Sequence, residues 1–469
     1  MALVFYNSLS RRRDELSKTP GEAIAMYSCG PTVYDFAHLG NLRSFIFADT
    51  LFRTLGYFGY KPSWAMNITD VDDKTIRGTI NQKGLTAKPA DLADYTKVFL
   101  TGFIEDLEKL NIDPKQIKIT RVTEIIPLIQ EKIIRLIDTG FAYRAEDGST
   151  YFSVNKYQEK YGDYGQMVGE NFLAGKKVGA RVKQDDYTKE NISDFALWKA
   201  RSEDDGEIYW DHPILGQGRP GWHIECSVVN DLSFKQKTID FHTGGVDLAF
   251  PHHTNEMAQS RALNDAPLSH FWLHLGLLLV EGQKMSKSLG NFVRLKDLPQ
   301  NNASPLAYRY LVLQSGYGQT LNFTQESLRA AGEAYRDLLL KTAWLLTQTN
   351  NTKGKILSAA KEEFMNALAD NLNTGSALAV LWKVLSYTDT NPADQLATIL
   401  DFDQVLGLDL KSAANLLDVP GEVRSLATQR EKARAEKDWS TADQLREQIN
   451  EQGFEISDTE NGPFIFRQF

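Results

Sequence analysis

The chain has 469 residues, of which 42% are hydrophobic and 24% are charged. This length exceeds what one hydrophobic core supports and predicts roughly two to four domains, and the composition is that of an ordinary globular protein. The net charge of −9 disfavours non-specific binding to nucleic acid. A locally basic surface would still suffice for a specific RNA partner.

No stretch of the sequence is typical of a membrane or secretory protein. The longest strongly apolar run, Trp272 to Val280, has about half of the length that a membrane helix needs. No apolar segment of signal-peptide length precedes Arg11, so we expect a cytoplasmic protein. Cys29 and Cys226 are the two cysteines. Without a secretion signal they predict no disulfide, and composition alone favours two inert buried thiols.

Strands and helices are predicted to alternate at the start of the chain. An apolar run at 23–29 predicts a buried strand that Gly30-Pro31 ends, and a helix-period stretch covers 42–57. A second strand is expected at 61–68. A strand, a glycine-bearing loop and a helix in this order are typical of doubly wound α/β folds.

The middle of the chain interrupts this alternation. A strong amphipathic helix is predicted over 123–139, and a hairpin with strands at 142–145 and 150–154 follows it. The helix buries one apolar face, formed by Ile125, Ile126, Ile129, Ile133, Leu136 and Ile137. The region therefore resembles an insertion into an α/β domain.

The α/β pattern resumes near Trp222, with strands expected at 238–243 and 275–280 and a helix from Pro251. After residue 300 helical patterns dominate, and Pro420-Gly421 marks a boundary. The helical segments are expected at 304–313, at 324–347 and between 359 and 408. The last segment, 422–469, predicts a charged helical hairpin that ends in apolar turns.

The motif His38-Leu39-Gly40-Asn41 lies where the first strand passes into its helix. Backbone N–H groups and the dipole of a helix start favour an anion there, and Gly40 allows close approach of a nucleotide. His38 can donate to phosphate oxygens. The alternative is an ordinary loop histidine.

A second motif, Lys284-Met285-Ser286-Lys287-Ser288, places two lysines and two hydroxyls in one short loop. Such a group can neutralise a triphosphate and stabilise its transition state. The alternative is a solvated basic turn, which the upstream histidine motif makes less favourable.

Together the two motifs resemble the signature of class I aminoacyl-tRNA synthetases, and their surroundings resemble the cysteinyl-tRNA synthetase family. Segments similar to that family are Cys29–Asp35, Asn67–Lys74, Gly218–Ser227, Gly244–Leu248 and Phe250–His253. Three positions depart from the family pattern. Asn41 replaces a common second histidine, Thr254 replaces an acidic residue, and 316–319 lacks a basic residue.

The resemblance implies an α/β fold with a Rossmann-type catalytic domain in two halves, 1–110 and 215–300. A connective insertion, 111–214, splits the halves. A stem-contact region, a helical bundle and a small C-terminal α/β-like anticodon-binding domain are implied at 301–345, 346–419 and 420–469.

The resemblance also implies four zinc ligands, which are Cys29, Cys226, His252 and Glu256. Two thiolates, an imidazole and a carboxylate suit tetrahedral zinc. His252 and Glu256 stand four apart, which puts both on one face of a helix. His253 stands three from Glu256, so spacing does not separate the two histidines and the resemblance favours His252. The alternative is a structural His-His pair.

The implied activity is ATP-dependent ligation of L-cysteine to tRNA(Cys) through cysteinyl-adenylate, with Mg²⁺ accompanying ATP and zinc selecting cysteine by its thiolate. Four residues are implied to act on the triphosphate: His38, Asn41, Lys284 and Lys287. ATP contacts are implied for Gly40, Ser286, Lys287 and Ser288. Thr69, Trp222 and Asp247 are candidates for holding cysteine, and ordinary fold residues otherwise.

The C-terminal segment is expected to bind the anticodon. One helix face carries Trp439, Asp443 and Arg446, and Arg434 and Asp458 are further candidates, because unstacked bases need an aromatic plane with fixed donors and acceptors. The alternative is a salt-bridged solvated helix that Trp439 anchors to the bundle. We expect a monomer.

Two other functions remain open from the sequence. A sister enzyme joins cysteine to an amino sugar in mycothiol synthesis and would share the catalytic half, but it should not need residues 420–469. A non-catalytic tRNA-binding paralogue is suggested only by Asn41.

Overall fold

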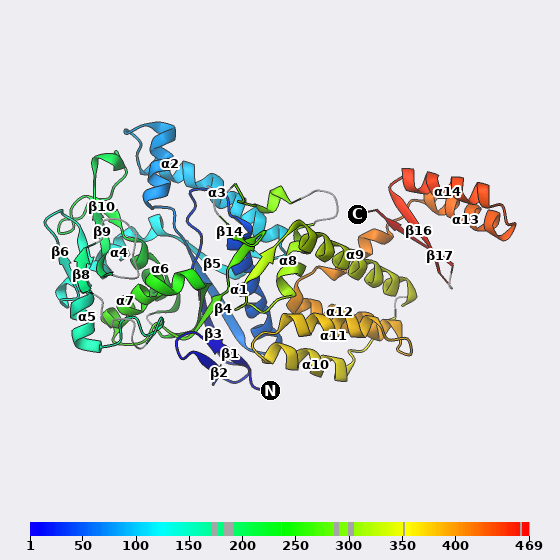
Figure 1. Cartoon of the computed structure of the whole chain (residues 1–469), viewed down its shortest axis with the longest axis horizontal. Coiled ribbons are helices and arrows are strands. Elements are labelled where there is room, and N and C mark those ends of the chain that lie inside the picture. Colours follow the sequence, from blue (N-terminus) through cyan, green and yellow to red (C-terminus); the bar gives the residue numbers. More distant parts are fainter. Residues whose placement is uncertain are drawn as a thin grey trace. The chain divides into compact units, whose positions relative to one another are not determined.

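The computed structural model describes residues 1–169, 177–181, 191–235, 237–285, 290–298, 304–349, 352–459 and 462–468. The chain forms two compact units (Figure 1). The first unit comprises Met1–Asp297, Gly316–Phe323 and Asp370–Leu372. The second comprises Leu298–Ser315, Thr324–Ala369 and Asn373–Phe469.

A five-stranded parallel sheet forms the centre of the first unit, in the order β12-β11-β3-β4-β5. The strands are β12 (Ser269–Leu275), β11 (Ile239–Gly245), β3 (Ala23–Ser28), β4 (Lys61–Ile68) and β5 (Ile117–Arg121). In chain order this is the 3-2-1-4-5 arrangement of a Rossmann fold. The predicted α/β fold class is confirmed.

Helices connect these strands, as parallel pairing requires. They are α1 (Leu39–Tyr57), α2 (Asp73–Lys83), α3 (Pro89–Lys109), α6 (Trp222–Phe234) and α7 (Thr254–Asn264). Helix α1 begins earlier than predicted because His38 and Asn41 form a capping box. The His38 Nδ1 accepts from the Asn41 N–H at 3.1 Å, and the Asn41 Oδ1 accepts from the His38 N–H at 3.3 Å.

The strand predicted at 275–280 is wrong as a single element. β12 ends at Leu275, and β13 (Leu278–Val280) pairs with β14 (Gln283–Lys284) and β15 (Leu321–Phe323) in a separate sheet. Gly276 lies at the break, where a Cβ atom would come within 2.3 Å of the Gln319 carbonyl oxygen. The chain therefore changes direction inside a continuous apolar run.

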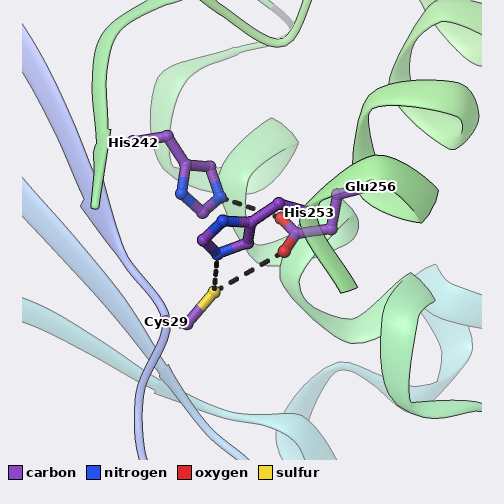
Figure 2. Close-up of side chains that lie close together, drawn as sticks. All are labelled: Cys29, His242, His253 and Glu256. Atoms are coloured by element: carbon purple, nitrogen blue, oxygen red, sulfur yellow. Dashed lines mark hydrogen bonds and ion pairs between the residues drawn. The ribbon is translucent and has the colours of Figure 1, made fainter. Parts of the chain in front are cut away.

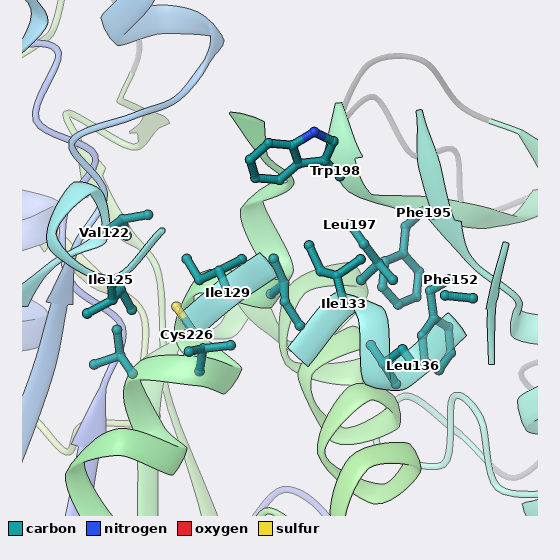
Figure 3. Packing of buried hydrophobic residues seen from close by; sticks show 14 of the residues in the cluster. Val122, Ile125, Ile129, Ile133, Leu136, Phe152, Phe195, Leu197, Trp198 and Cys226 are labelled. Carbon is teal, nitrogen blue, oxygen red and sulfur yellow. The ribbon is translucent and has the colours of Figure 1, made fainter. Parts of the chain in front are cut away.

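The inserted region forms its own antiparallel sheet, β10-β9-β7-β6, with β8 beside β9. Its elements, with two flanking helices, are α4 (Ile126–Asp138), β6 (Ala142–Arg144), β7 (Thr150–Phe152), α5 (Val154–Tyr161), β8 (Lys177–Arg181), β9 (Asn191–Ala200) and β10 (Gly218–Pro220). The apolar face of α4 packs against α6 and the inserted sheet in one core that also holds Cys226 (Figure 3). β5 lies within 111–214 but is an edge strand of the parallel sheet.

A short hairpin, β1 (Val4–Asn7) with β2 (Arg12–Glu15), opens the first unit. The second unit is mainly helical, and its helices are α8 (Pro305–Leu313), α9 (Gln325–Gln348), α10 (Ser358–Ala369), α11 (Thr374–Leu385), α12 (Pro392–Leu406), α13 (Gly421–Ala435) and α14 (Trp439–Glu451). Within the described residues, every helix is too short or too polar to traverse a bilayer.

The chain ends in a β-hairpin, β16 (Phe454–Thr459) with β17 (Gly462–Arg467), which corrects the apolar turns expected there. Phe454 and Ile456 alternate with more exposed residues and pack with Val423 and Ile449 of the preceding helices. This period of two distinguishes a half-buried strand from a turn.

Candidate active site and metal centre

A cavity of about 310 Å³ lies at the carboxyl ends of β3 and β11. These two neighbouring strands mark the switch point of the sheet, where doubly wound folds bind ligands. Seven residues singled out from the sequence line this cavity: Cys29, His38, Gly40, Asn41, Trp222, Asp247 and Lys284.

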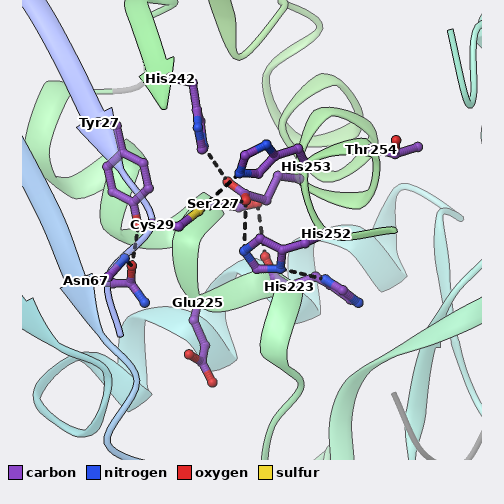
Figure 4. Close-up of polar contacts among 12 residues, drawn as sticks. Tyr27, Cys29, Asn67, His223, Glu225, Ser227, His242, His252, His253 and Thr254 are labelled. Atoms are coloured by element: carbon purple, nitrogen blue, oxygen red, sulfur yellow. Dashed lines mark hydrogen bonds and ion pairs between the residues drawn. The ribbon is translucent and has the colours of Figure 1, made fainter. Parts of the chain in front are cut away.

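The four predicted metal ligands converge beside this cavity. One donor atom from each of Cys29, Cys226, His252 and Glu256 lies within 4.8 Å of the others. Cys29 follows β3, whereas Cys226 lies one turn inside α6 rather than at its start. Cys226, His252 and Glu256 are each at most 1% exposed. Residues far apart in the sequence thus meet in one buried group (Figure 4).

His252 and Glu256 face each other as their spacing predicts. The His252 Nε2 lies 3.0 Å from the Glu256 Oε1. The other imidazole nitrogen, Nδ1, lies 2.9 Å from the Nδ1 of His223. Trp222 stacks on the His252 ring with 4.2 Å between ring centroids. Such contacts fix the orientation of an imidazole, as partners of metal-bound histidines commonly do.

A second group of donors shares two members with the first (Figure 2). Its atoms, from Cys29, His242, His253 and Glu256, also lie within 4.8 Å of one another. The His253 Nε2 lies 3.4 Å from the Cys29 Sγ, and the His242 Nε2 lies 2.9 Å from the Glu256 Oε2. Both histidines of the 252–253 pair therefore reach the shared donors.

Burial and neighbouring charges set the pKa values of these groups. Burial raises the pKa of Glu256, but the imidazoles of His242 and His252 hold it well below its usual range. Burial lowers the pKa of His252, whereas Glu256 and Cys226 together raise it to about 10. For Cys226, the hydrogen bond with Cys29 and the charge of His252 outweigh burial and lower the pKa to about 6. Glu256 and Cys226 thus favour their anionic forms, which suits a divalent cation, whereas burial and the neighbouring Cys226 raise the pKa of Cys29 well above its usual range.

The structure places Thr69 beside the cavity but not on its wall. Its hydroxyl donates to the Glu225 Oε2 at 2.7 Å and accepts from the Asn67 Nδ2 at 3.0 Å. Thr69 and Glu225 are each 1% exposed, and burial raises the pKa of the Glu225 carboxyl well above its usual range. The Asn67 Oδ1 also accepts from the N–H of Gly30, the residue after Cys29, at 2.8 Å.

The phosphate-binding candidates that the structure describes line the same cavity as Cys29 but come from other elements. His38 caps α1, and Lys284 is an exposed residue of β14. The chain that follows the lysine motif returns to α1, where the Leu39 N–H donates to the Val293 carbonyl at 2.9 Å. The Phe292 ring meets the His38 ring edge-on at 5.0 Å. Ser286, Lys287 and Ser288 lie outside the described residues.

Two histidines of the site, His242 and His274, were not singled out from the sequence. Both contact His253, whose Nδ1 lies 2.8 Å from the His274 Nε2 and whose ring centroid lies 4.5 Å from that of His242. A signal was present, because six of the eight histidines fall in the range 223–274. Only the fold shows that they meet.

The C-terminal candidates divide into an exposed and a paired group. Trp439 is 59% exposed at the start of α14, so it does not anchor this helix to the bundle. Asp443 and Arg446 are also exposed on α14. Asp458 is bound on both oxygens by Arg430, at 2.8 and 3.2 Å, and also contacts Arg434. Arg430 was missed by the sequence analysis.

Comparisons with known proteins agree with this architecture. The family model "tRNA synthetases class I (C) catalytic domain" matches residues 15–333, and "Cysteinyl-tRNA ligase anticodon binding domain" matches residues 417–463. The chain is 40% identical over 478 residues to a cysteine–tRNA ligase from Chlamydia caviae, covering 99% of this chain and 97% of the relative. It is 39% identical over 481 residues to the same kind of ligase from Protochlamydia amoebophila, covering 99% and 98%.

The fold is also similar to that of a solved structure, LeuRS from Agrobacterium radiobacter K84 in a ternary complex with tRNA and LeuAMS. The TM-score is 0.61 at 11% sequence identity, and the match covers 85% of each chain. This likeness supports the fold alone, whereas the sequence matches extend over nearly the whole chain. The chain therefore belongs to the cysteinyl-tRNA synthetase family of class I aminoacyl-tRNA synthetases.

Proposed function

We propose that the chain joins L-cysteine to tRNA(Cys) in two steps and consumes ATP. In the first step the carboxylate of cysteine attacks the α-phosphate of ATP, which forms cysteinyl-adenylate as pyrophosphate leaves with the electron pair of the broken bond. In the second step a ribose hydroxyl of the terminal adenosine takes the cysteinyl group. No side-chain nucleophile is needed, because positioning and charge stabilisation suffice.

The observation that carries this proposal is the convergence of the Cys29, Cys226, His252 and Glu256 donors beside a cavity that His38 and Lys284 also border. The first group fits zinc better than the second because it holds two sulfurs, and thiolates with imidazole are preferred zinc ligands. A bound zinc would hold the substrate by its thiolate. Serine lacks that sulfur, and a site built on one specific contact rejects the analogue without it by roughly 10⁴-fold or more.

His38, Asn41, Lys284 and Lys287 are proposed to stabilise the triphosphate while Mg²⁺ accompanies ATP, with Gly40, Ser286 and Ser288 in contact with it. Asn41 supports this role although it replaces a histidine. Its oxygen serves the helix cap, and its amide nitrogen has no hydrogen-bond partner within the described part of the chain. That nitrogen remains a donor for phosphate.

Trp222 and Asp247 are proposed to contact cysteine directly, since both line the cavity. Thr69 does not line the cavity and is proposed to act indirectly, through its hydrogen bonds with Asn67 and Glu225. We also propose the domain division that the resemblance implies, with domains at 1–110, 111–214, 215–300, 301–345, 346–419 and 420–469. A monomer and a cytoplasmic location are further proposals.

The proposed anticodon surface is the face of α14 that carries Trp439, Asp443 and Arg446, with Arg434 and Asp458 beside it. An exposed tryptophan on a charged helix offers a plane on which an unpaired base can stack. The match of residues 417–463 to an anticodon-binding family favours the tRNA ligase over an amino-sugar ligase, which needs no such region.

Two assays on the full chain test the proposal. Cysteine-dependent exchange of pyrophosphate into ATP is expected, with serine at least roughly 10⁴-fold less effective. Charging of tRNA(Cys) is expected, without ligation of cysteine to an amino sugar. No exchange by a folded preparation would indicate a non-catalytic tRNA-binding paralogue, and ligation to the amino sugar without charging would indicate the mycothiol enzyme.

A further inference from the structure

A second cavity, of about 630 Å³, adjoins the first one in the same unit. Asp247 and Lys284 line both cavities. The remaining wall of the second cavity includes Tyr6 and Arg11 from the N-terminal hairpin, and Val246 and Phe250 from the segment after β11. Asp247 and Lys284 therefore form a wall common to both cavities, and a ligand in the second would lie next to the first.

Arg11 differs from the two arginines that follow it. Arg12 pairs with Asp14, and Arg13 pairs with Asp370. The Arg11 guanidinium donates only to the carbonyl oxygen of Gln166, at 3.0 Å, and has no carboxylate partner within the described residues. Its charge is thus available to an anion in the cavity. Among the described residues that line the cavity, Asp247 is the only carboxylate, and it lies at the wall shared with the first cavity.

The same cavity presents apolar surface to solvent. Tyr6 is 44% exposed and Val246 is 46% exposed, although both are large apolar side chains. An exposed aromatic ring near an arginine that has no carboxylate partner among the described residues is a combination with which proteins bind single-stranded nucleic acid. The ring stacks on a base, and the guanidinium contacts a phosphate.

The proposed reaction brings a single-stranded nucleotide close to the first cavity. Cysteine and ATP use the first cavity, and the second step brings in a nucleotide whose ribose hydroxyl must reach the cysteinyl-adenylate. We propose that the second cavity binds the single-stranded 3′ end of the tRNA, with Tyr6 against a base and Arg11 on a phosphate. This inference rests on the proposed function and adds a site for its second substrate.

The transfer step balances without a further reactant. The ribose oxygen forms an ester bond with the cysteinyl carbonyl carbon, while the bond from that carbon to the phosphate oxygen of AMP breaks. AMP leaves with the electron pair, and the hydroxyl proton passes to its phosphate. Tyr6 and Arg11 take no part in these bond changes, so they act by placing the hydroxyl.

The test separates the two half-reactions in the full chain. Tyr6→Ala and Arg11→Ala are compared with the wild type in pyrophosphate exchange and in single-turnover transfer from preformed cysteinyl-adenylate to tRNA(Cys). We expect exchange to stay within about twofold and transfer to fall about tenfold or more, since base stacking and phosphate contacts each contribute at this scale. Tyr6→Phe should restore transfer, because the ring is kept.

Arg12→Ala is the matched control, because it removes an arginine of the same hairpin whose charge is already paired. It should leave both half-reactions unchanged. The proposal is overturned if both test variants transfer at the wild-type rate, or if exchange and transfer fall in parallel. Failure of the proposed function would look different, because the wild type itself would then show no exchange.

Discussion

The Cys29 Sγ lies 3.5 Å from the Glu256 Oε1, although the two residues stand 227 positions apart in the chain. The contact exists because β3 and β11 are parallel neighbours, so the segments that follow them leave the sheet at the same edge. Cys226 and His252 reach the same point from α6 and from the turn that leads into α7. The fold thus assembles a candidate metal site from three separate segments, one of which supplies both His252 and Glu256.

The two adjacent histidines should differ in their effect on metal binding. We expect His252→Ala to lose zinc on dialysis against a chelator, because it removes a donor from the group with two sulfurs. His253→Ala should retain zinc, since its contact with Cys29 is that of an outer partner, whose loss weakens affinity by about 10- to 100-fold. Metal analysis of the dialysed variants gives the answer. If His253→Ala lost zinc and His252→Ala retained it, the ion would be assigned to the second group.

Arg43 should matter for stability far more than surface arginines do. It is 2% exposed and donates to the carbonyl oxygens of Gly276, Leu277 and Gln319 at 2.7, 2.9 and 2.7 Å. Arg43→Ala removes this donor from the Gly276 and Gln319 oxygens, whereas the Leu277 oxygen keeps the Leu321 N–H at 2.9 Å. The change is expected to cost about 3 kcal/mol or more of unfolding free energy. Arg12→Ala, in an exposed pair, should cost about 0–1 kcal/mol.

Denaturant unfolding of both arginine variants measures this difference. Equal midpoints for Arg43→Ala and Arg12→Ala would mean that the buried hydrogen bonds do not hold the turn between β12 and β13.

Trp439 should affect tRNA binding without affecting cysteine activation. Its helix packs through Ala442, Leu445 and Ile449. The Trp439 ring is exposed and takes no part in that packing. We expect Trp439→Ala to weaken tRNA(Cys) binding by about 1–3 kcal/mol, the scale of one base stacked on an aromatic ring. Trp439→Phe should keep most of the affinity. Binding titrations beside exchange assays check this, and an unchanged Kd for Trp439→Ala would exclude stacking there.

The pair between Asp458 and Arg430 should make the terminal hairpin sensitive to acid. The hydrogen bonds from Arg430 lower the pKa of Asp458 below its usual value of about 3.8. A lowered carboxyl pKa stabilises the fold above the unfolded value and loses this contribution as pH falls through the folded value. We expect the hydrogen-exchange protection of β16 in the wild type to exceed that in Asp458→Asn near neutral pH, and the difference to shrink as the pH falls below about 3.8 toward the lower folded pKa. A difference that did not shrink in stronger acid would contradict this assignment.

Some of this molecule could be predicted from its residues because short-range rules govern it. The strand at Lys61–Ile68 has the predicted bounds, and the buried residues of α4 include Ile126, Ile129, Ile133 and Leu136 of the predicted apolar face. Spacing along a helix also predicted that His252 and Glu256 face each other. In each case the relevant partners lie within a few residues along the chain.

Other features depend on contacts between distant segments and could not be predicted in this way. The break at Gly276 arises from the Gln319 backbone, and the role of Thr69 is set by Glu225 on another element. The imidazoles of His242 and His274 join the site only through the strand order of the sheet. Asn41 differs from these residues because its contact is local: it caps its own helix, a role that the family pattern did not suggest.

The metal content of the purified, active chain tests the central claim most directly. We predict about one zinc per chain in the wild type and loss of that zinc in Cys29→Ala and Cys226→Ala, because both sulfurs belong to one group of four donors. Cysteine-dependent exchange should fall with zinc content in the same samples. A wild-type preparation that activates cysteine at full rate while containing no zinc would contradict the account.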